Sequence, residues 1–353
     1  MTIPHSRPTI DQDDVEAVSR TLISGNIAQG ERVKEFENEI ARFIGVKHAV
    51  ACSSGSAALH LALLSLEPKN KDEIIMPSYV CSSPYFATVH AGAKPKIADI
   101  DPSNFNISAH TAKKHVSAKT KAIIAPHMFG NPVELDELLD LRVPVIEDCA
   151  QSLGAEYKKR RVGSLGDLSV FSFYATKMIT TGEGGMVLTN TDEYHSRIIE
   201  ARDYDKKPLT PPKYNYKMTD LQAALGLSQL KKLHSFIDRR RQIASHYTGQ
   251  FSKHVISTPT EHPKNKSVYY RYVITVNNAN QTQKTAREKG IMCEKPVWKP
   301  LHQSLRKFKC PTTDYVHAHA LSVPLYPSLS QEETEKITKN LTSTFRKLHS
   351  QQR

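Results

Sequence analysis

One lysine in this sequence has a setting suited to covalent chemistry. Lys177 lies within FSFYATKMITTGEGGMV, five residues after Ser172 and shortly before the turn at Gly182–Gly185. A lysine amine becomes a nucleophile only when it is deprotonated, which desolvation or a neighbouring cation favours. Thr176 and Met178 flank Lys177 instead of charged residues, and the glycines allow a turn that larger side chains would block. This context distinguishes Lys177 from a solvated surface lysine.

A pair of acidic residues ends another apolar segment. VPVIEDCAQ, at residues 143–151, has the pattern of a buried strand that finishes at Glu147 and Asp148. Ligands of open α/β sheets gather at the carboxyl ends of the strands, where an acid can hold a positive charge inside a cleft. An ordinary helix-capping aspartate is the alternative that this segment leaves open.

Small residues at 53–58, SSGSAA, lead directly into an apolar helical stretch. Backbone N–H groups and the helix dipole at such a helix start favour an anion such as phosphate. No Gly-Lys-Ser/Thr follows, so the segment is not a P-loop. By itself the pattern fits a phosphate site and a tight turn without a ligand equally well.

The charge of the chain is strongly positive but dispersed. The 48 basic and 36 acidic residues give a net charge of +12, with short basic runs at Lys158–Arg161 and Arg239–Arg241. A nucleic-acid-binding domain usually concentrates its charge beside aromatic platforms or a groove-reading helix, so we predict no nucleic-acid partner. Solvated surface explains most of this charge, and steering of a diphosphate-bearing substrate is the functional alternative.

Cysteines and histidines give no metal-binding signature. The five cysteines are scattered without a CxxC pair, which predicts neither a disulfide framework nor a zinc ribbon. Among the sixteen histidines, His317 and His319 have HxH spacing, but they lie in a polar stretch. We therefore predict no metal.

Membrane insertion and secretion are not predicted. There is no apolar run of about eighteen residues, the minimum for a membrane-spanning helix. The N-terminal MTIPHSRPTIDQDD lacks an apolar core and carries acids early, unlike a secretory signal. We expect a cytoplasmic protein.

Short apolar strands alternate with helical stretches over the first two thirds of the chain, which is typical of an α/β domain around a mostly parallel sheet. Strands are predicted at residues 48–52, 73–76, 95–99, 122–125, 143–147, 168–173 and 185–189. Helices are predicted at residues 13–24, 33–44, 83–91, 134–139 and 220–242.

The pattern changes after about residue 240. A strand at 269–276 and helices at 282–289 and 331–348 predict a smaller α+β domain. We therefore predict a large α/β domain over residues 1–240 and a small C-terminal domain over 241–353.

The ordered set of motifs resembles, over nearly the whole chain, the DegT–StrS family of sugar aminotransferases that depend on pyridoxal 5′-phosphate (PLP). These are fold type I enzymes of the aspartate aminotransferase kind. The matching segments include SGNIAQGERVKEFENEIARFIGVKHAVACSSGSAALHLALL, DEIIMPSYV, AGAKPKIADID, VIEDCAQSLGAEY, VGSLGDLSVFSFYATKMITTGEGGMV, YNYKMTDLQAALGLSQL, KPLH and SVPLYPSLS.

The resemblance implies catalytic roles for Lys177 and Asp148 and a cofactor-binding role for Gln151. Lys177 matches the family's lysine that binds PLP covalently. Asp148 matches the acid that pairs with the pyridine nitrogen of PLP and keeps it protonated. Gln151 matches the residue near the phenolic oxygen of the ring.

The resemblance also implies how the cofactor phosphate is held. Gly55 and Ser56 match the backbone cradle, and Ser172 matches a phosphate-binding hydroxyl. Asn215 matches an asparagine that reaches the cofactor phosphate of the partner subunit, which implies a homodimer with composite active sites.

The sequence departs from the family pattern at two places. Cys81 replaces an aromatic residue that stacks on the PLP ring in many members. The segment Arg202–Asp205 replaces an Arg-x-His-Gly motif that borders the substrate in relatives. Residues predicted to contact the substrate are His127, Arg202, His302 and Tyr326.

The resemblance implies transfer of an amino group from L-glutamate to a nucleotide-linked keto sugar, for surface polysaccharide or a related glycoconjugate. Lys177 argues against a sugar dehydratase, because relatives that run that reaction carry histidine there. A non-catalytic PLP-fold regulator would be expected to have lost Lys177, Asp148 or the phosphate cradle, and all three are present. Transamination of a cyclitol or another cyclic ketone is an open alternative.

Overall fold

A computed structural model describes residues 2–350, and the side chains of residues 2–348. Its centre is a seven-stranded sheet with the order β1-β9-β8-β5-β4-β2-β3. The strands of this sheet are β1 (His48–Cys52), β2 (Glu73–Pro77), β3 (Lys94–Ala98), β4 (Thr120–Pro126), β5 (Val145–Asp148), β8 (Leu168–Ser172) and β9 (Gly185–Thr189). Strands β3, β2, β4, β5 and β8 run parallel, whereas β9 is antiparallel to both β8 and β1. A short hairpin joins β6 (Glu156–Tyr157) and β7 (Arg160–Arg161).

Two apolar clusters cover the two faces of the sheet. Val50 and Cys52 of β1 belong to one cluster and Ala51 between them belongs to the other, as expected for side chains that alternate along a strand. The first face is covered by α3 (Gly55–Ser65), α4 (Ser83–His90) and α7 (Asp192–Arg202). The second is covered by α2 (Glu31–Ile44), α5 (Ala109–Lys113), α6 (Leu135–Leu139) and the first half of α8 (Asp220–Phe251).

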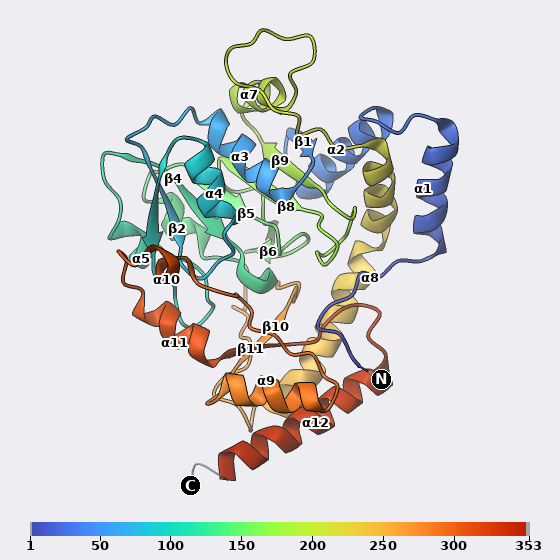
Figure 1. The fold of residues 1–353 in the computed structure, drawn as a ribbon, viewed down its shortest axis with the longest axis vertical. Helices are drawn as coiled ribbons and strands as arrows, with labels where there is room; N and C mark the ends of the chain where they lie inside the picture. Colours follow the sequence, from blue (N-terminus) through green and yellow to red (C-terminus); the bar gives the residue numbers. More distant parts are fainter. Residues whose placement is uncertain (1, 351–353) are drawn as a thin grey trace.

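The C-terminal part has an apolar cluster of its own. Helix α8 runs from the sheet towards it without interruption (Figure 1). The cluster combines residues of the second half of α8 with Ile3, whose backbone forms a bridge to Ile291. Its elements are the antiparallel pair β10 (Tyr272–Thr275) and β11 (Ala320–Val323), together with α9 (Ala279–Glu288) and α12 (Gln331–Ser350).

Three short elements and α1 complete the fold. Helix α1 (Gln12–Ser24) packs against α8. Helices α10 (Leu301–Leu305) and α11 (Pro311–His319) pack back onto the first face of the large sheet, where Leu301 and Val316 join its cluster. The 3-10 turn η1 (Met128–Gly130) follows β4.

The α/β fold and most predicted elements are confirmed. The predicted strand boundaries agree within about two residues for the seven central strands, and Gly25 ends α1 in a left-handed conformation. Helix α8 is longer than predicted. Elements α5, α7, α10, α11 and β11 had no counterpart in the prediction. The predicted boundary at residues 240/241 lies inside α8 and stays a prediction, and residues 351–353 of the second domain lie outside the described residues.

Candidate active site

The start of helix α3 and the end of strand β8 meet in a close contact. A Cβ added to Gly55 would lie 2.7 Å from the Cβ of Ser172, so no larger residue fits there without a shift. Ser54 caps α3, and its hydroxyl accepts a hydrogen bond from the N–H of Ala57 at 3.1 Å. The other free N–H groups of the first turn and the Ser172 hydroxyl can therefore hold an anion. The phosphate contacts of Gly55, Ser56 and Ser172 stay predictions.

A hollow rich in hydroxyl groups lies beside this cradle. Its volume is about 480 Å³, and its walls include Ser54, Ser56, Cys81 and Ser83. The hydroxyls of Ser56 and Ser83 lie 2.7 Å apart. Small polar walls at a helix N-terminus suit a phosphate group, because several donors can converge on its oxygens.

Asp148 ends β5 at the carboxyl edge of the sheet and is buried. Burial raises the pKa of its carboxyl, while the N–H of Ala150 and the positive charge of Lys177 lower it in part. The Ala150 N–H donates to Oδ1 at 3.1 Å. The carboxylate therefore requires a cationic partner in order to stay ionised, and Lys177 is near enough to act on it.

Lys177 lies on the loop after β8 and is half-buried. Its backbone N–H donates to the Tyr174 carbonyl at 2.9 Å, which fixes the loop. Its side chain lines a cavity of about 510 Å³ together with Cys81, Gln151 and Tyr270. The cavity and the hydroxyl-rich hollow share Cys81 in their walls, so the amine and the anion cradle open into neighbouring spaces.

Two residues that sequence reasoning did not single out also line the Lys177 cavity. The ring centroid of Tyr270 lies 5.2 Å from Lys177 Nζ and 5.1 Å from Arg271 Cζ. Burial opposes ionisation of the Tyr270 phenol, but the charges of Lys177 and Arg271 lower its pKa to about 8. From the sequence, residues 269–276 were predicted only as a strand. The aromatic pair Tyr269 and Tyr270 directly before Arg271 was the one local feature that could have drawn attention to this segment.

Gln151 is held with one end towards the backbone. Its Oε1 accepts a hydrogen bond from the N–H of Phe129 at 2.8 Å. Because Gln151 also lines the Lys177 cavity, its amide N–H₂ group is available there as a donor. The contact of Gln151 with an oxygen of the cofactor ring stays a prediction.

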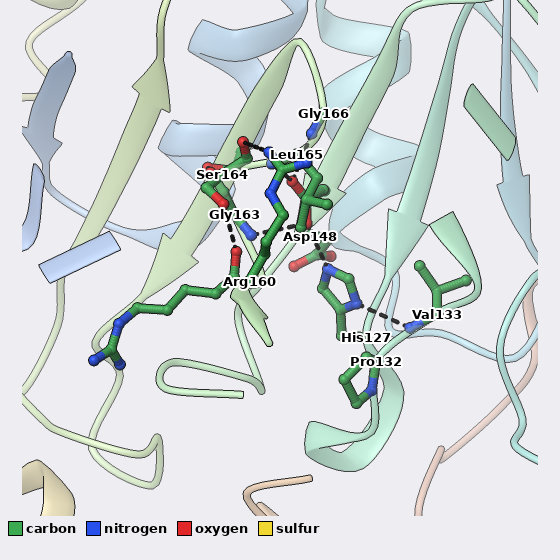
Figure 2. Close-up of polar contacts among 12 residues, drawn as sticks. His127, Pro132, Val133, Asp148, Arg160, Gly163, Ser164, Leu165 and Gly166 are labelled. Atoms are coloured by element: carbon green, nitrogen blue, oxygen red, sulfur yellow. Dashed lines mark hydrogen bonds and ion pairs between the residues drawn. The ribbon is translucent and has the colours of Figure 1, made fainter. Parts of the chain in front are cut away.

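A buried network fixes the strand end that carries Asp148. Glu147 Oε1 accepts hydrogen bonds from the N–H groups of Leu165 and Gly166, at 2.8 and 2.7 Å. Its Oε2 accepts from the N–H of Gly163 at 2.7 Å and lies 3.1 Å from His127 Nε2. Figure 2 shows the loop of Gly163–Gly166 and the His127 ring converging beside Asp148.

The tautomer of His127 follows from this network. The N–H of Val133 donates to Nδ1 at 3.0 Å, so Nε2 carries the ring proton and donates to Glu147 (Figure 2). His127, Glu147 and Cys149 lie near enough together to resemble a metal-ligand group. However, both Glu147 oxygens and both His127 nitrogens are already occupied by hydrogen bonds, which supports a structural role.

Comparison with known proteins identifies the fold and the chemistry. The sequence profile of the DegT/DnrJ/EryC1/StrS aminotransferase family matches residues 8–342. The chain is 32% identical to a GDP-perosamine synthase of Escherichia coli O157:H7, over 97% of this chain and 98% of the relative. Helicobacter pylori PseC, an aminotransferase of pseudoaminic acid biosynthesis, superposes with a TM-score of 0.90 at 27% identity, covering 98% of this chain and all of PseC.

The chain belongs to the DegT/DnrJ/EryC1/StrS aminotransferase family. The PLP-form of the putative sugar aminotransferase Spr1654 from Streptococcus pneumoniae superposes with a TM-score of 0.93 at 26% identity, covering 98% of this chain and 99% of that one. Members of this family depend on PLP, and the residues of this chain fit that cofactor. Gly55 leaves the space that a phosphate cradle needs, and the buried Asp148 carboxylate needs a cation of the kind that a protonated pyridine ring provides.

The family departure at Cys81 is visible in the cavity wall. The Cys81 side chain is exposed to the space between the cradle and Lys177. The protein around it nevertheless desolvates the thiol and raises its pKa, and Asp148 adds to this effect. The thiol is therefore neutral, and it offers a PLP ring less contact area than an aromatic side chain would.

Two of the residues predicted to contact substrate are held in internal ion pairs or hydrogen bonds away from the Lys177 cavity. His127 is fully buried in the network with Glu147. Arg202 is buried at the end of α7, where Nη1 donates to Glu37 Oε1 at 2.8 Å and to the Ala51 carbonyl at 2.9 Å.

The other two predicted substrate residues are also buried. His302 lies between the hydroxyl of Ser78, 2.6 Å from Nδ1, and Asp314 Oδ1, 3.1 Å from Nε2. Tyr326 belongs to the C-terminal cluster, and the guanidinium of Arg7 lies 5.2 Å from its ring centroid. None of these four residues is among those that line the Lys177 cavity.

Within residues 2–350, the structure contains no helix whose length and apolar character would allow it to cross a bilayer. The location in the cytoplasm stays a prediction.

Proposed function

We propose that this protein transfers an amino group from L-glutamate to a nucleotide-linked keto sugar, and that it acts in the cytoplasm as a homodimer. The observation that carries the proposal is the convergence of the Lys177 amine and the Asp148 carboxylate beside the anion cradle of Gly55 and Ser172. The nucleotide-linked acceptor is supported by the name of the Escherichia coli relative, a GDP-perosamine synthase.

Lys177, Asp148 and Gln151 have different chemical roles in this proposal. When bound, PLP supplies a ring that accepts electrons from the donor's α-carbon. The Lys177 amine would hold the cofactor, and as a free amine it would act as the general base for the α-carbon proton of the donor. Asp148 would pair with the pyridine nitrogen of PLP and keep it protonated, and Gln151 would donate to the phenolic oxygen of the ring.

Aromatic surfaces at the rim of the Lys177 cavity support a nucleotide-bearing acceptor. The single tryptophan of the chain, Trp298, is 88% exposed at this rim, and Phe86 is half exposed. Flat exposed rings suit stacking on a nucleobase. The cavity of about 510 Å³ has room for the sugar, with the base outside at the rim.

The placement of Asn215 supports composite active sites. The rings of Tyr214 and Tyr216 stack on each other and both contact His60 of α3. Residues two apart on an extended segment share one side, so Asn215 between them points the other way, and it is exposed. An exposed amide on that side is free to enter the cradle of a second subunit.

Helix α1 and the segment after it leave large apolar side chains uncovered. Leu22 and Ile23 are 59% and 85% exposed, and Ile27 is 44% exposed. Clustered apolar exposure of this kind is typical of a surface that another protein covers. A second copy of this chain is the partner that the composite site requires.

The cofactor assignment is tested by reducing the PLP-loaded protein with borohydride and mapping the modified peptide. We expect the cofactor on Lys177, and its recovery on another lysine would contradict the assignment. The acceptor is then identified by supplying L-glutamate and a panel of nucleotide-linked 3-keto and 4-keto sugars, with a cyclitol ketone as the competing acceptor. Conversion of the cyclitol alone would overturn the nucleotide-sugar proposal.

The composite site is tested by mixing inactive subunits. Lys177→Ala and Asn215→Ala proteins are each expected to be severely impaired, because each damages every site of its own homodimer. A mixed dimer contains one site with both natural residues, so part of the activity should return. Absence of recovery in dimers shown to be mixed would count against the trans role of Asn215.

A further inference from the structure

Two cations share one aromatic ring in the wall of the Lys177 cavity. Arg271 immediately precedes β10, and its guanidinium carbon lies 5.1 Å from the Tyr270 ring centroid. Lys177 Nζ lies 5.2 Å from the same centroid. The two charges therefore lie against the same ring and, by the sum of these two distances, at most about 10 Å apart.

The charge of Arg271 is not balanced by an acid. No carboxylate forms an ion pair with it among the side chains of residues 2–348, whereas Arg241 pairs with Glu261 at 2.8 Å. The partner of Arg271 is His5, whose Nδ1 lies 2.9 Å from Nη1. Burial and the nearby Arg271 lower the pKa of His5 to about 3, so the imidazole is neutral and accepts this hydrogen bond.

The surroundings add to the positive potential. Arg240, buried behind Tyr270, donates through Nη1 to the carbonyls of Tyr270 and Leu325, both at 3.1 Å, and also has no acidic partner among the described side chains. Lys177, Arg271 and Arg240 together lower the pKa of the Tyr270 phenol against the effect of its burial. A half-buried guanidinium in such a field favours an anionic ligand strongly, because few water molecules screen it.

The cavity wall that Arg271 shares with Lys177 indicates which anion it binds. In an amino-acid donor, the α-carboxylate is attached to the carbon whose proton Lys177 removes. In a nucleotide-linked sugar, the sugar ring separates the diphosphate from the keto carbon. An anion bound beside Lys177 therefore matches the donor and not the diphosphate.

We infer that Arg271 binds the α-carboxylate of the amino donor, with His5 orienting its guanidinium. This donor subsite rests on the proposed function, since it takes Lys177 as the reacting amine. The keto sugar carries no charge near its reacting carbon, so Arg271 contributes to the half-reaction with the amino acid and not to the half-reaction with the sugar.

The test compares the PLP-loaded wild type with Arg271→Gln and Arg271→Lys. We expect Arg271→Gln to weaken equilibrium binding of 2-oxoglutarate, measured by calorimetry, by about 10- to 100-fold, the loss expected for a charge-assisted hydrogen bond. The apparent affinity for L-glutamate in a single half-reaction should fall by the same factor. The half-reaction of the pyridoxamine phosphate form with the keto sugar should change by less than about 2-fold. Arg271→Lys should recover part of the binding.

A matched control removes a different cation from the same cavity. Lys299 is exposed at the rim, and Lys299→Gln changes the net charge by the same amount. We expect it to leave 2-oxoglutarate binding within about 2-fold of the wild type, because a solvated rim charge is screened.

Three outcomes would overturn the inference. Unchanged 2-oxoglutarate binding in Arg271→Gln would remove the donor subsite. Equal weakening for 4-aminobutyrate, which lacks the α-carboxylate, would assign Arg271 to the distal carboxylate. Weakened binding of a nucleoside diphosphate with normal 2-oxoglutarate binding would assign it to the acceptor. If Arg271→Gln fails to retain PLP, the same binding measurements are made on Arg271→Lys and compared with the wild type. Borohydride labelling of Lys177 in the wild type separates all of these outcomes from failure of the proposed function.

Discussion

Replacing Glu147 with glutamine should test whether a buried carboxylate holds the active-site strand end in place. The Glu147 carboxylate is fully buried and accepts four hydrogen bonds, two on each oxygen. A glutamine side chain has nearly the same shape, but one of its two terminal groups is a donor. Whichever way the amide is turned, its N–H₂ group faces two donors.

The size of the effect follows from these contacts. On one side the conflicting donors are the N–H groups of Leu165 and Gly166, and on the other they are Gly163 N–H and His127 Nε2–H. His127 cannot switch tautomer without meeting the N–H of Val133 at Nδ1. Two hydrogen bonds to a charged group are therefore lost, at roughly 1.5–3 kcal/mol each, which predicts about 3–6 kcal/mol less free energy of unfolding.

The measurement is urea unfolding of the PLP-free protein, with Glu137→Gln as the control. Glu137 is exposed, so the same chemical change should alter the free energy of unfolding by less than about 0.5 kcal/mol. We also expect PLP affinity to fall in Glu147→Gln, because Asp148 is the next residue of the same strand end. A Glu147→Gln protein within about 1 kcal/mol of the wild type would refute the reasoning.

The pH dependence gives a second check on the same variant. Burial opposes ionisation of Glu147, but hydrogen bonds from His127 and from the loop N–H groups outweigh it and lower its pKa below 4.5. The folded protein therefore binds this proton more weakly than the unfolded chain does. The stabilisation is present above about pH 4.5 and is lost as pH falls through the folded pKa, so the difference between wild type and variant should narrow in acid.

Three further predictions concern the cofactor site. Gly55→Ala should lower PLP affinity by at least about 10-fold in a cofactor titration, because the new Cβ would push α3 away from Ser172. The control Gly249→Ala has open space around its added Cβ and should leave PLP affinity unchanged. Equal PLP affinities of the two variants would contradict the phosphate cradle. Asp148→Asn should stabilise the PLP-free protein at pH 7, because burial raises the pKa of Asp148 and so makes its negative charge unfavourable in the folded state. In thermal melts, the stability difference between variant and wild type should shrink as pH falls through the folded pKa towards 3.8. A stability difference that does not change with pH would refute this explanation. Cys81→Phe should tighten PLP binding by about 2- to 10-fold through ring stacking, and unchanged affinity would make this departure irrelevant to retention.

Much of the fold was predictable because its signals are local. The alternation of apolar segments located the seven strands of the large sheet, and Gly25 marked the end of α1. The order of the strands was not predictable in the same way. Strand β9 lies between β1 and β8 and runs against both, which depends on contacts between segments more than a hundred residues apart in the case of β1. The uninterrupted course of α8 likewise depends on apolar clusters at both of its ends.

The chemical character predicted for the site follows from local sequence motifs. Lys177, Asp148 and the small residues around Gly55 lie in contiguous motifs, because backbone turns and strand ends impose residue types on their immediate neighbours. Long-range packing, in contrast, placed Arg271 against the same Tyr270 ring as Lys177 and enclosed His127 in the network of Glu147. The residue type of a histidine or an arginine does not indicate whether its side chain faces a cavity or a buried carboxylate. Its role depends on partners that are distant in the chain and are brought near by packing of the sheet against the C-terminal part.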